Sequence, residues 1–79
     1  MDSIIERINK SIYLFDKNIS LINEKELSEK EKLIVELAKD YRRDSTSWLE
    51  KNDYITSFAA IEYAHGLLDA ILKLKGLIE

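Results

Sequence analysis

The segment SWLEKNDYITS, residues 47–57, joins two long amphipathic patterns through only two residues, Asn52 and Asp53. Asparagine can take the left-handed backbone conformation that ends a helix, and an aspartate after it can cap the next helix. A link this short forces the flanking helices to lie side by side in opposite directions. This two-residue link, which we call the corner, therefore predicts an antiparallel helical hairpin.

Both helices of this hairpin carry start or stop signals. Downstream of the corner we expect a helix over residues 54–75, with Gly76 as its stop. Upstream we expect a helix over residues 29–51, because Ser28 and Glu31 have the spacing of a capping box. Leu27 is expected to close a hydrophobic staple over the stem of Lys32 or over Leu33.

The upstream helix carries an apolar stripe that we expect to face the core. Folding the hairpin about its corner would bring Ser45 near Ala60 and Trp48 opposite Ser57, so that large residues meet small ones. The expected buried positions are Ile34, Leu37, Ala38, Tyr41, Ser45 and Trp48.

A third helix is expected over residues 3–22. Its apolar residues recur every three or four positions, which keeps one narrow stripe facing a partner. The stripe consists of Ile5, Ile8, Ile12, Phe15, Ile19 and Ile22. Three helices of about 20 residues are each roughly 30 Å long. The sequence thus predicts an all-α fold, an antiparallel three-helix bundle that makes one domain of residues 1–79.

The amino-acid composition excludes several classes of function. The 79 residues include no cysteine and one histidine, and the net charge is −3 with acids and bases interleaved. These features argue against a zinc site and against a general nucleic-acid binder. No apolar run is long enough to span a membrane, and the start does not resemble a signal peptide, so we expect a cytoplasmic protein. Phosphate-binding loops and nucleophile motifs are missing from the sequence, so we expect neither an enzyme nor a cofactor.

The run YAHGLLDA, residues 63–70, places a histidine beside a glycine inside a helical pattern. A helical wheel puts His65 at the edge of the polar side of its helix. Glu62 and His65 have the Glu-x-x-His spacing that di-iron bundles use. Such a site also needs a second Glu-x-x-His pair and further glutamates, so we expect no metal. A glycine inside a helix is about 1 kcal/mol less favourable than an alanine. We therefore expect that Gly66 is present because it lets two helices pack closely.

The helix over residues 54–75 is apolar over a wider arc than a lone bundle needs. A second row runs along its shoulder and is formed by Phe58, Ile61, His65, Leu68 and Leu72. Either the first helix covers this row, or the row binds a partner protein or a second copy as a homodimer. We favour a non-enzymatic module for protein interaction or self-association.

An alternative function is an accessory protein that binds RNA or a nucleotide. Its contacts would come from Tyr41, Arg42 and Arg43, with His65 in support. Two arginines do not make a basic patch, however, and Asp40 and Asp44 flank them.

Two stretches carry a family resemblance. They are Ala38-Lys-Asp-Tyr41 through Lys51-Asn-Asp-Tyr54, and the run from Ala60 to Ala70. Together they resemble a small, mainly archaeal family of uncharacterised proteins, domain of unknown function 357. Asn52 and Ser57 stand where that family would have glycine and alanine. The resemblance implies a three-helix bundle and an archaeal cytoplasmic source, and it transfers no functional residue.

Overall fold

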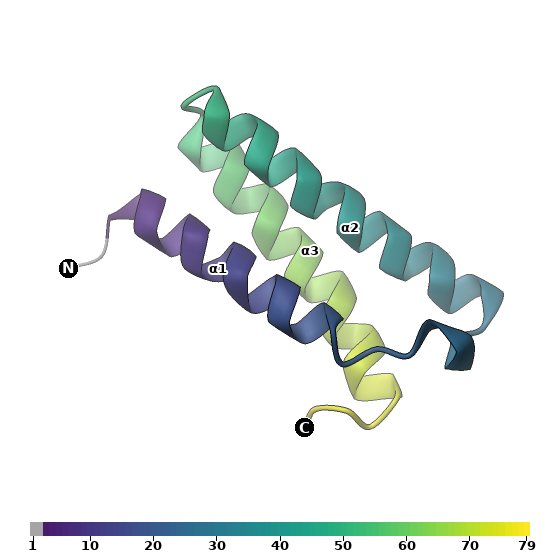
Figure 1. The fold of residues 1–79 in the computed structure, drawn as a ribbon. Coiled ribbons are helices and arrows are strands. Elements are labelled where there is room, and N and C mark those ends of the chain that lie inside the picture. The colour runs from purple at the N-terminus through teal and green to yellow at the C-terminus, as the bar shows by residue number, and fades with distance from the viewer. Residues whose placement is uncertain (1–2) are drawn as a thin grey trace.

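The computed structural model describes residues 3–79 and contains three α-helices joined by short connections. They are α1 (Ile4–Ile19), α2 (Glu29–Glu50) and α3 (Tyr54–Leu74), and a single 3₁₀ turn, η1 (Glu24–Glu26), lies between the first two. Figure 1 shows that consecutive helices run in opposite directions, so α1 and α3 are parallel and α2 opposes both. The predicted antiparallel three-helix bundle is confirmed.

The corner between α2 and α3 forms as its two residues predict. Asn52 has a φ of 63°, in the left-handed region, and Asp53 caps α3 by accepting a hydrogen bond from the Thr56 amide. Gly76 has a φ of 71° just beyond α3, and the Leu77 amide donates back to the Leu72 carbonyl. Both ends of α3 are therefore fixed by local signals.

The helix α1 ends three residues earlier than the apolar stripe predicts. The Ser20 hydroxyl donates to the Lys17 carbonyl at the point where the chain leaves the helix. Ile22 nevertheless packs against the core from outside the helix. The apolar contact that its spacing predicts is kept, although the helix does not extend that far.

The start of α2 is a complete capping box. The Glu31 amide donates to the Ser28 hydroxyl, and the Ser28 amide donates to the Glu31 carboxylate at 2.8 Å. The staple predicted for Leu27 does not form with Leu33, which is 72% exposed. Leu27 is buried against Val35 and Ile71 instead, because the approach of α3 offers more apolar surface there.

The helix α3 is the centre of the bundle. It packs along most of α2, more briefly against α1, and α1 touches α2 only slightly. The main core therefore lies where α3 meets its two neighbours. Its buried members are Phe15, Ala38, Ile61, Ala64, Leu68 and Leu72.

The buried face of α2 agrees with the predicted one only in part. Ala38 and Ser45 are buried as predicted, and Val35 is buried although the sequence pattern does not predict it. Ile34, Leu37 and Trp48, which the pattern predicts to be buried, are 38–43% exposed. Arg42 lies on the side of α2 that faces α1, where it pairs with Asp16, so the helix is rotated about its own axis relative to the prediction. The stripe expected in the core is thus partly on the surface.

The register of the hairpin also differs. The partner of Ser57 is Ser45, not Trp48. Both serines are fully buried, so small residues face each other where the prediction pairs large with small. The two helices approach closely at this level.

Candidate protein-docking surface

The row predicted as an interface on α3 lies beneath α1. Ile61, Leu68 and Leu72 are fully buried, while Phe58 and His65 are half-buried. The Arg7 guanidinium of α1 lies 5.4 Å from the centre of the Phe58 ring. Of the two readings that the sequence leaves open, the structure shows the first, in which α1 covers the row. This corrects the expectation that the row is available to a partner.

His65 ties α1 to α3. Its Nε2 lies 2.7 Å from the Ser11 carbonyl oxygen, and its ring meets the Phe15 ring edge-on at 5.8 Å. Because a carbonyl oxygen only accepts, Nε2 carries the proton and donates. The neighbouring Glu62 accepts a hydrogen bond from the Ser11 hydroxyl at 3.0 Å. His65 therefore has a structural role between two helices.

The three residues of the nucleic-acid alternative point in different directions. Arg42 makes a two-point ion pair with Asp16 of α1, at 2.9 and 2.8 Å, and also donates to Thr46. Arg43 pairs with Asp40 at the surface. Tyr41 lies against Tyr63 of α3, with ring centres 4.5 Å apart. Successive helical residues diverge by about 100°, which explains why these side chains form no common patch.

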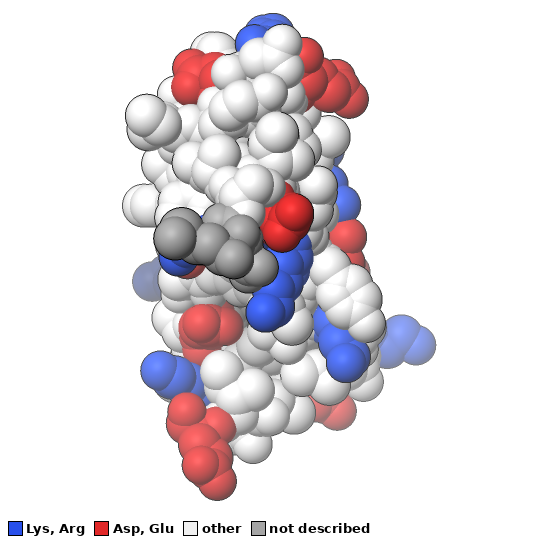
Figure 2. All heavy atoms as spheres, turned by 90° about the vertical axis from the view of Figure 1, so that its left-hand side faces the viewer, with Lys and Arg blue, Asp and Glu red and all other residues white. Residues whose placement is uncertain are grey.

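Charge is mixed on the face that Figure 2 shows. Blue and red side chains are interspersed there, and neither colour forms a large area on the part of that face that is not grey. Among residues 3–79, no group of three histidine or acidic side chains is placed to hold a metal ion. Within the same residues, none of the helices has the length and apolar character needed to cross a bilayer.

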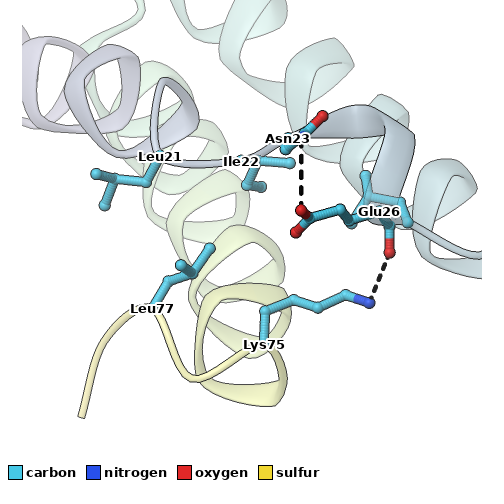
Figure 3. A pocket seen from close by; sticks show the side chains of 7 residues that line it. Leu21, Ile22, Asn23, Glu26, Lys75 and Leu77 are labelled. Atoms are coloured by element: carbon cyan, nitrogen blue, oxygen red, sulfur yellow. Dashed lines mark hydrogen bonds between the residues drawn. The ribbon is translucent and has the colours of Figure 1, made fainter.

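Two small hollows lie near the end of the bundle where α2 begins. One of about 60 Å³ is lined by the residues that Figure 3 draws, and Lys75 bridges it by donating to the Glu26 carbonyl and pairing with Glu31. The other, of about 140 Å³, lies between Glu24 and Val35. Both are well below the 300–1,000 Å³ that small-molecule sites occupy.

A larger hollow lies between α2 and α3. It has a volume of about 300 Å³. Its lining is Tyr41, Asp44, Trp48, Thr56, Ala59, Ala60 and Tyr63. Sequence reasoning missed this site because it assigned Tyr41 and Trp48 to the core. The hollow is open and mostly apolar, which is typical of a surface that receives an apolar side chain.

The hollow belongs to a longer apolar band, which we call the open face. On α2 its members are spaced by three, four and seven residues, and on α3 it continues with small residues and three large ones. Its members are Ile34, Leu37, Tyr41 and Trp48 on α2, and Ala59, Ala60, Tyr63, Gly66, Leu67, Ala70 and Leu74 on α3. Tyr63 is 54% and Leu74 70% exposed. The open face thus presents two adjacent helical stripes, the arrangement into which further helices pack in four-helix bundles.

Gly66 has no packing role within the chain. A Cβ atom built on it meets no atom within 4 Å. The prediction that Gly66 allows close packing inside the bundle is therefore wrong, because this residue lies on the outer side of α3. Ala59 and Ala70 are likewise exposed.

Comparison with known proteins identifies a family. The family model described as "Protein of unknown function (DUF357)" matches residues 11–77. A comparison with curated proteins found no significant match. The match covers α1 from residue 11 onward and the whole of the α2–α3 hairpin, which forms the open face.

Proposed function

Because the chain belongs to the family of domain of unknown function 357, for which no activity is defined, we propose from its geometry that it is a non-enzymatic module that binds protein through the open face. The observation that carries the proposal is the set of large apolar side chains that α2 and α3 leave half-exposed. They are Ile34, Leu37, Trp48, Tyr63 and Leu74. Exposed apolar bands of this kind typically mark protein contacts.

The polar chemistry of the molecule supports the same proposal. The charged side chains that contact more than one helix, such as Arg42 and Lys75, serve to join helices. His65 is likewise held by a backbone carbonyl. By contrast, the open face combines aromatic rings with small residues, a composition that suits the ridge of another helix.

A pair of matched tyrosine variants tests the proposal. Tyr63 on the open face is 54% exposed and Tyr13 on α1 is 57% exposed. We expect Tyr63→Glu to abolish chemical cross-linking of the protein to its binding protein in a lysate, and Tyr13→Glu to leave it intact. Both variants should keep the helical circular dichroism of the wild type, since both side chains face solvent.

Two outcomes would contradict the proposal. One is that both variants cross-link equally well, which would place the contact elsewhere. The other is that RNA, and no protein, is recovered with the wild type and that Arg43→Ala loses this RNA. That result would favour the nucleic-acid alternative.

A further inference from the structure

We propose that the occupant of the open face is a second copy of this chain, packed antiparallel across a two-fold axis that passes beside Leu37 and Gly66. This inference rests on the proposed function and names its partner. Such an axis would place α2 on α2 and α3 on α3, each pair running in opposite directions. Since α2 and α3 are themselves antiparallel, all four neighbouring pairs in the resulting four-helix bundle would be antiparallel.

The first argument is that the axis crosses both helices at one level. The Tyr41 and Tyr63 rings are 4.5 Å apart, which fixes those two residues opposite each other. One turn further along each helix, away from the corner, helix geometry places Leu37 and Gly66 at the same level. An axis perpendicular to the helices at that level can therefore relate both stripes at once.

The second argument is that α3 becomes complementary to its own copy. About this axis, Tyr63 of one copy lies over Ala70 of the other, and Leu74 lies over Ala59 and Ala60. Large side chains thus meet small ones where the two copies of α3 are in contact. Gly66 sits beside the axis, where the two α3 backbones come closest, which gives this helix-interior glycine a role that it lacks within one chain.

The third argument is charge. Lys30 and Asp44 occupy opposite ends of the same stripe of α2, seven residues on either side of Leu37. Both are exposed, and neither forms an ion pair with another residue among 3–79. Rotation about the axis brings Lys30 of each copy to Asp44 of the other. A parallel arrangement would instead place like charges together.

The size of the face is sufficient for a weak dimer. The half-exposed large side chains present on the order of 500 Å² of apolar surface per copy. Two copies would then bury about 1,000 Å², near the lower end of specific interfaces. Interfaces of this size are typically weak and transient, so we expect a dissociation constant in the micromolar range.

Sedimentation velocity of the whole chain from a few micromolar to about 0.5 mM tests the assembly. We expect a monomer–dimer equilibrium that Tyr63→Glu and Gly66→Leu each shift toward the monomer by at least about tenfold, with the Tyr13→Glu control unchanged. Because the space around Gly66 is open within one chain, Gly66→Leu should fold normally, which circular dichroism checks.

Charge reversal tests the orientation. Lys30→Asp and Asp44→Lys should each weaken the dimer about tenfold, because each dimer contains the pair twice. The dissociation constant of the double variant should return to within about threefold of the wild-type value. A double variant that dimerises more weakly than either single variant would overturn the antiparallel arrangement.

Failure of this inference differs from failure of the proposed function. A wild type that stays monomeric at 0.5 mM, yet cross-links to a different protein in a Tyr63-dependent way, overturns only the second copy as occupant. A dimer that Tyr63→Glu leaves unchanged overturns the second copy as occupant, because the dimer contact then lies off the open face. It overturns the proposed function as well if Tyr63→Glu also leaves the cross-linking unchanged.

Discussion

Ser45 of α2 and Ser57 of α3 exchange hydrogen bonds: each hydroxyl donates to the backbone carbonyl of the other residue, at 2.8 and 2.7 Å. Both side chains are fully buried. The exchange satisfies two polar groups inside an apolar interface and holds the two helices at a short separation.

Substitution of Ser57 tests this close approach. Ser57→Ala removes one buried hydrogen bond and should lower the free energy of unfolding by about 1 kcal/mol. Ser57→Leu has to force the helices apart and should cost about 3 kcal/mol or more. Urea unfolding followed by circular dichroism measures both values. If leucine costs no more than alanine, the helices are not in close contact there.

Removal of the His65 hydrogen bond should weaken the attachment of α1. His65→Leu retains apolar contact with Phe15 but leaves the Ser11 carbonyl without its second donor. We expect a loss of about 1 kcal/mol in the free energy of unfolding, with faster amide hydrogen exchange confined to α1. Equal acceleration over all three helices would mean that His65 supports the whole core instead.

The ion pair between Arg42 and Asp16 should make stability depend on pH. Hydrogen bonding to the Arg42 guanidinium lowers the pKa of Asp16, and burial opposes this only in part. A lowered pKa in the folded state stabilises the fold above the unfolded pKa, near pH 4, and this stabilisation is lost as pH falls through the folded value.

The matching measurement compares the wild type with Asp16→Asn. The variant should be less stable by up to about 1 kcal/mol at pH 7, since both partners are partly exposed, and the difference should shrink as the pH falls below about 4. Lys75 acts similarly on Glu31, whose pKa its hydrogen bond also lowers. A difference between wild type and variant that is constant from pH 7 to pH 3 would show that the charge of Asp16 is not responsible.

Gly66→Ala should change folding and assembly in opposite directions. The added methyl group meets no atom within 4 Å, so the helix propensity of alanine should raise the free energy of unfolding of the monomer by up to about 1 kcal/mol. The same methyl group lies at the closest point of the proposed dimer and should weaken it. Thermal unfolding of dilute protein and sedimentation of concentrated protein separate the two effects. Loss of monomer stability would contradict the open position of Gly66.

The parts of the fold that sequence predicts well are local. The corner at Asn52 and Asp53 and the capping box at Ser28 and Glu31 depend on residues within one turn of each other, and both form as predicted. The end of α1 is less predictable, because Ile22 satisfies the apolar pattern from outside the helix.

The rotation of α2 depends on contacts far apart in sequence. This helix carries two neighbouring apolar stripes, and either could face the core. In the structure Val35, Ala38 and Ser45 face the core, and Ser45 contacts Ser57 of α3. The spacing correctly assigns Ala38 and Ser45 to the core, but it also assigns Leu37 and Trp48 to it, and these side chains lie on the open face.

A signal for the open face is present in the sequence of α3. Gly66 and Ala59 lie on the side of the helix opposite Ile61 and Leu68, as a helical wheel shows. Both are exposed, and a Cβ atom on Gly66 would meet no atom within 4 Å, whereas Ala64 is buried in the core. The sequence pattern favours the row beneath α1 as the interface, because the side chains of that row are larger.

The central claim, that the open face receives a second copy, is tested most directly by amide chemical shifts recorded at low and high protein concentration. The prediction is that shifts change with concentration along α2 around Leu37 and along α3 from Ala59 to Leu74, while those near Tyr13 on α1 stay constant. Changes confined to α1, or no change up to about 0.5 mM, would contradict it.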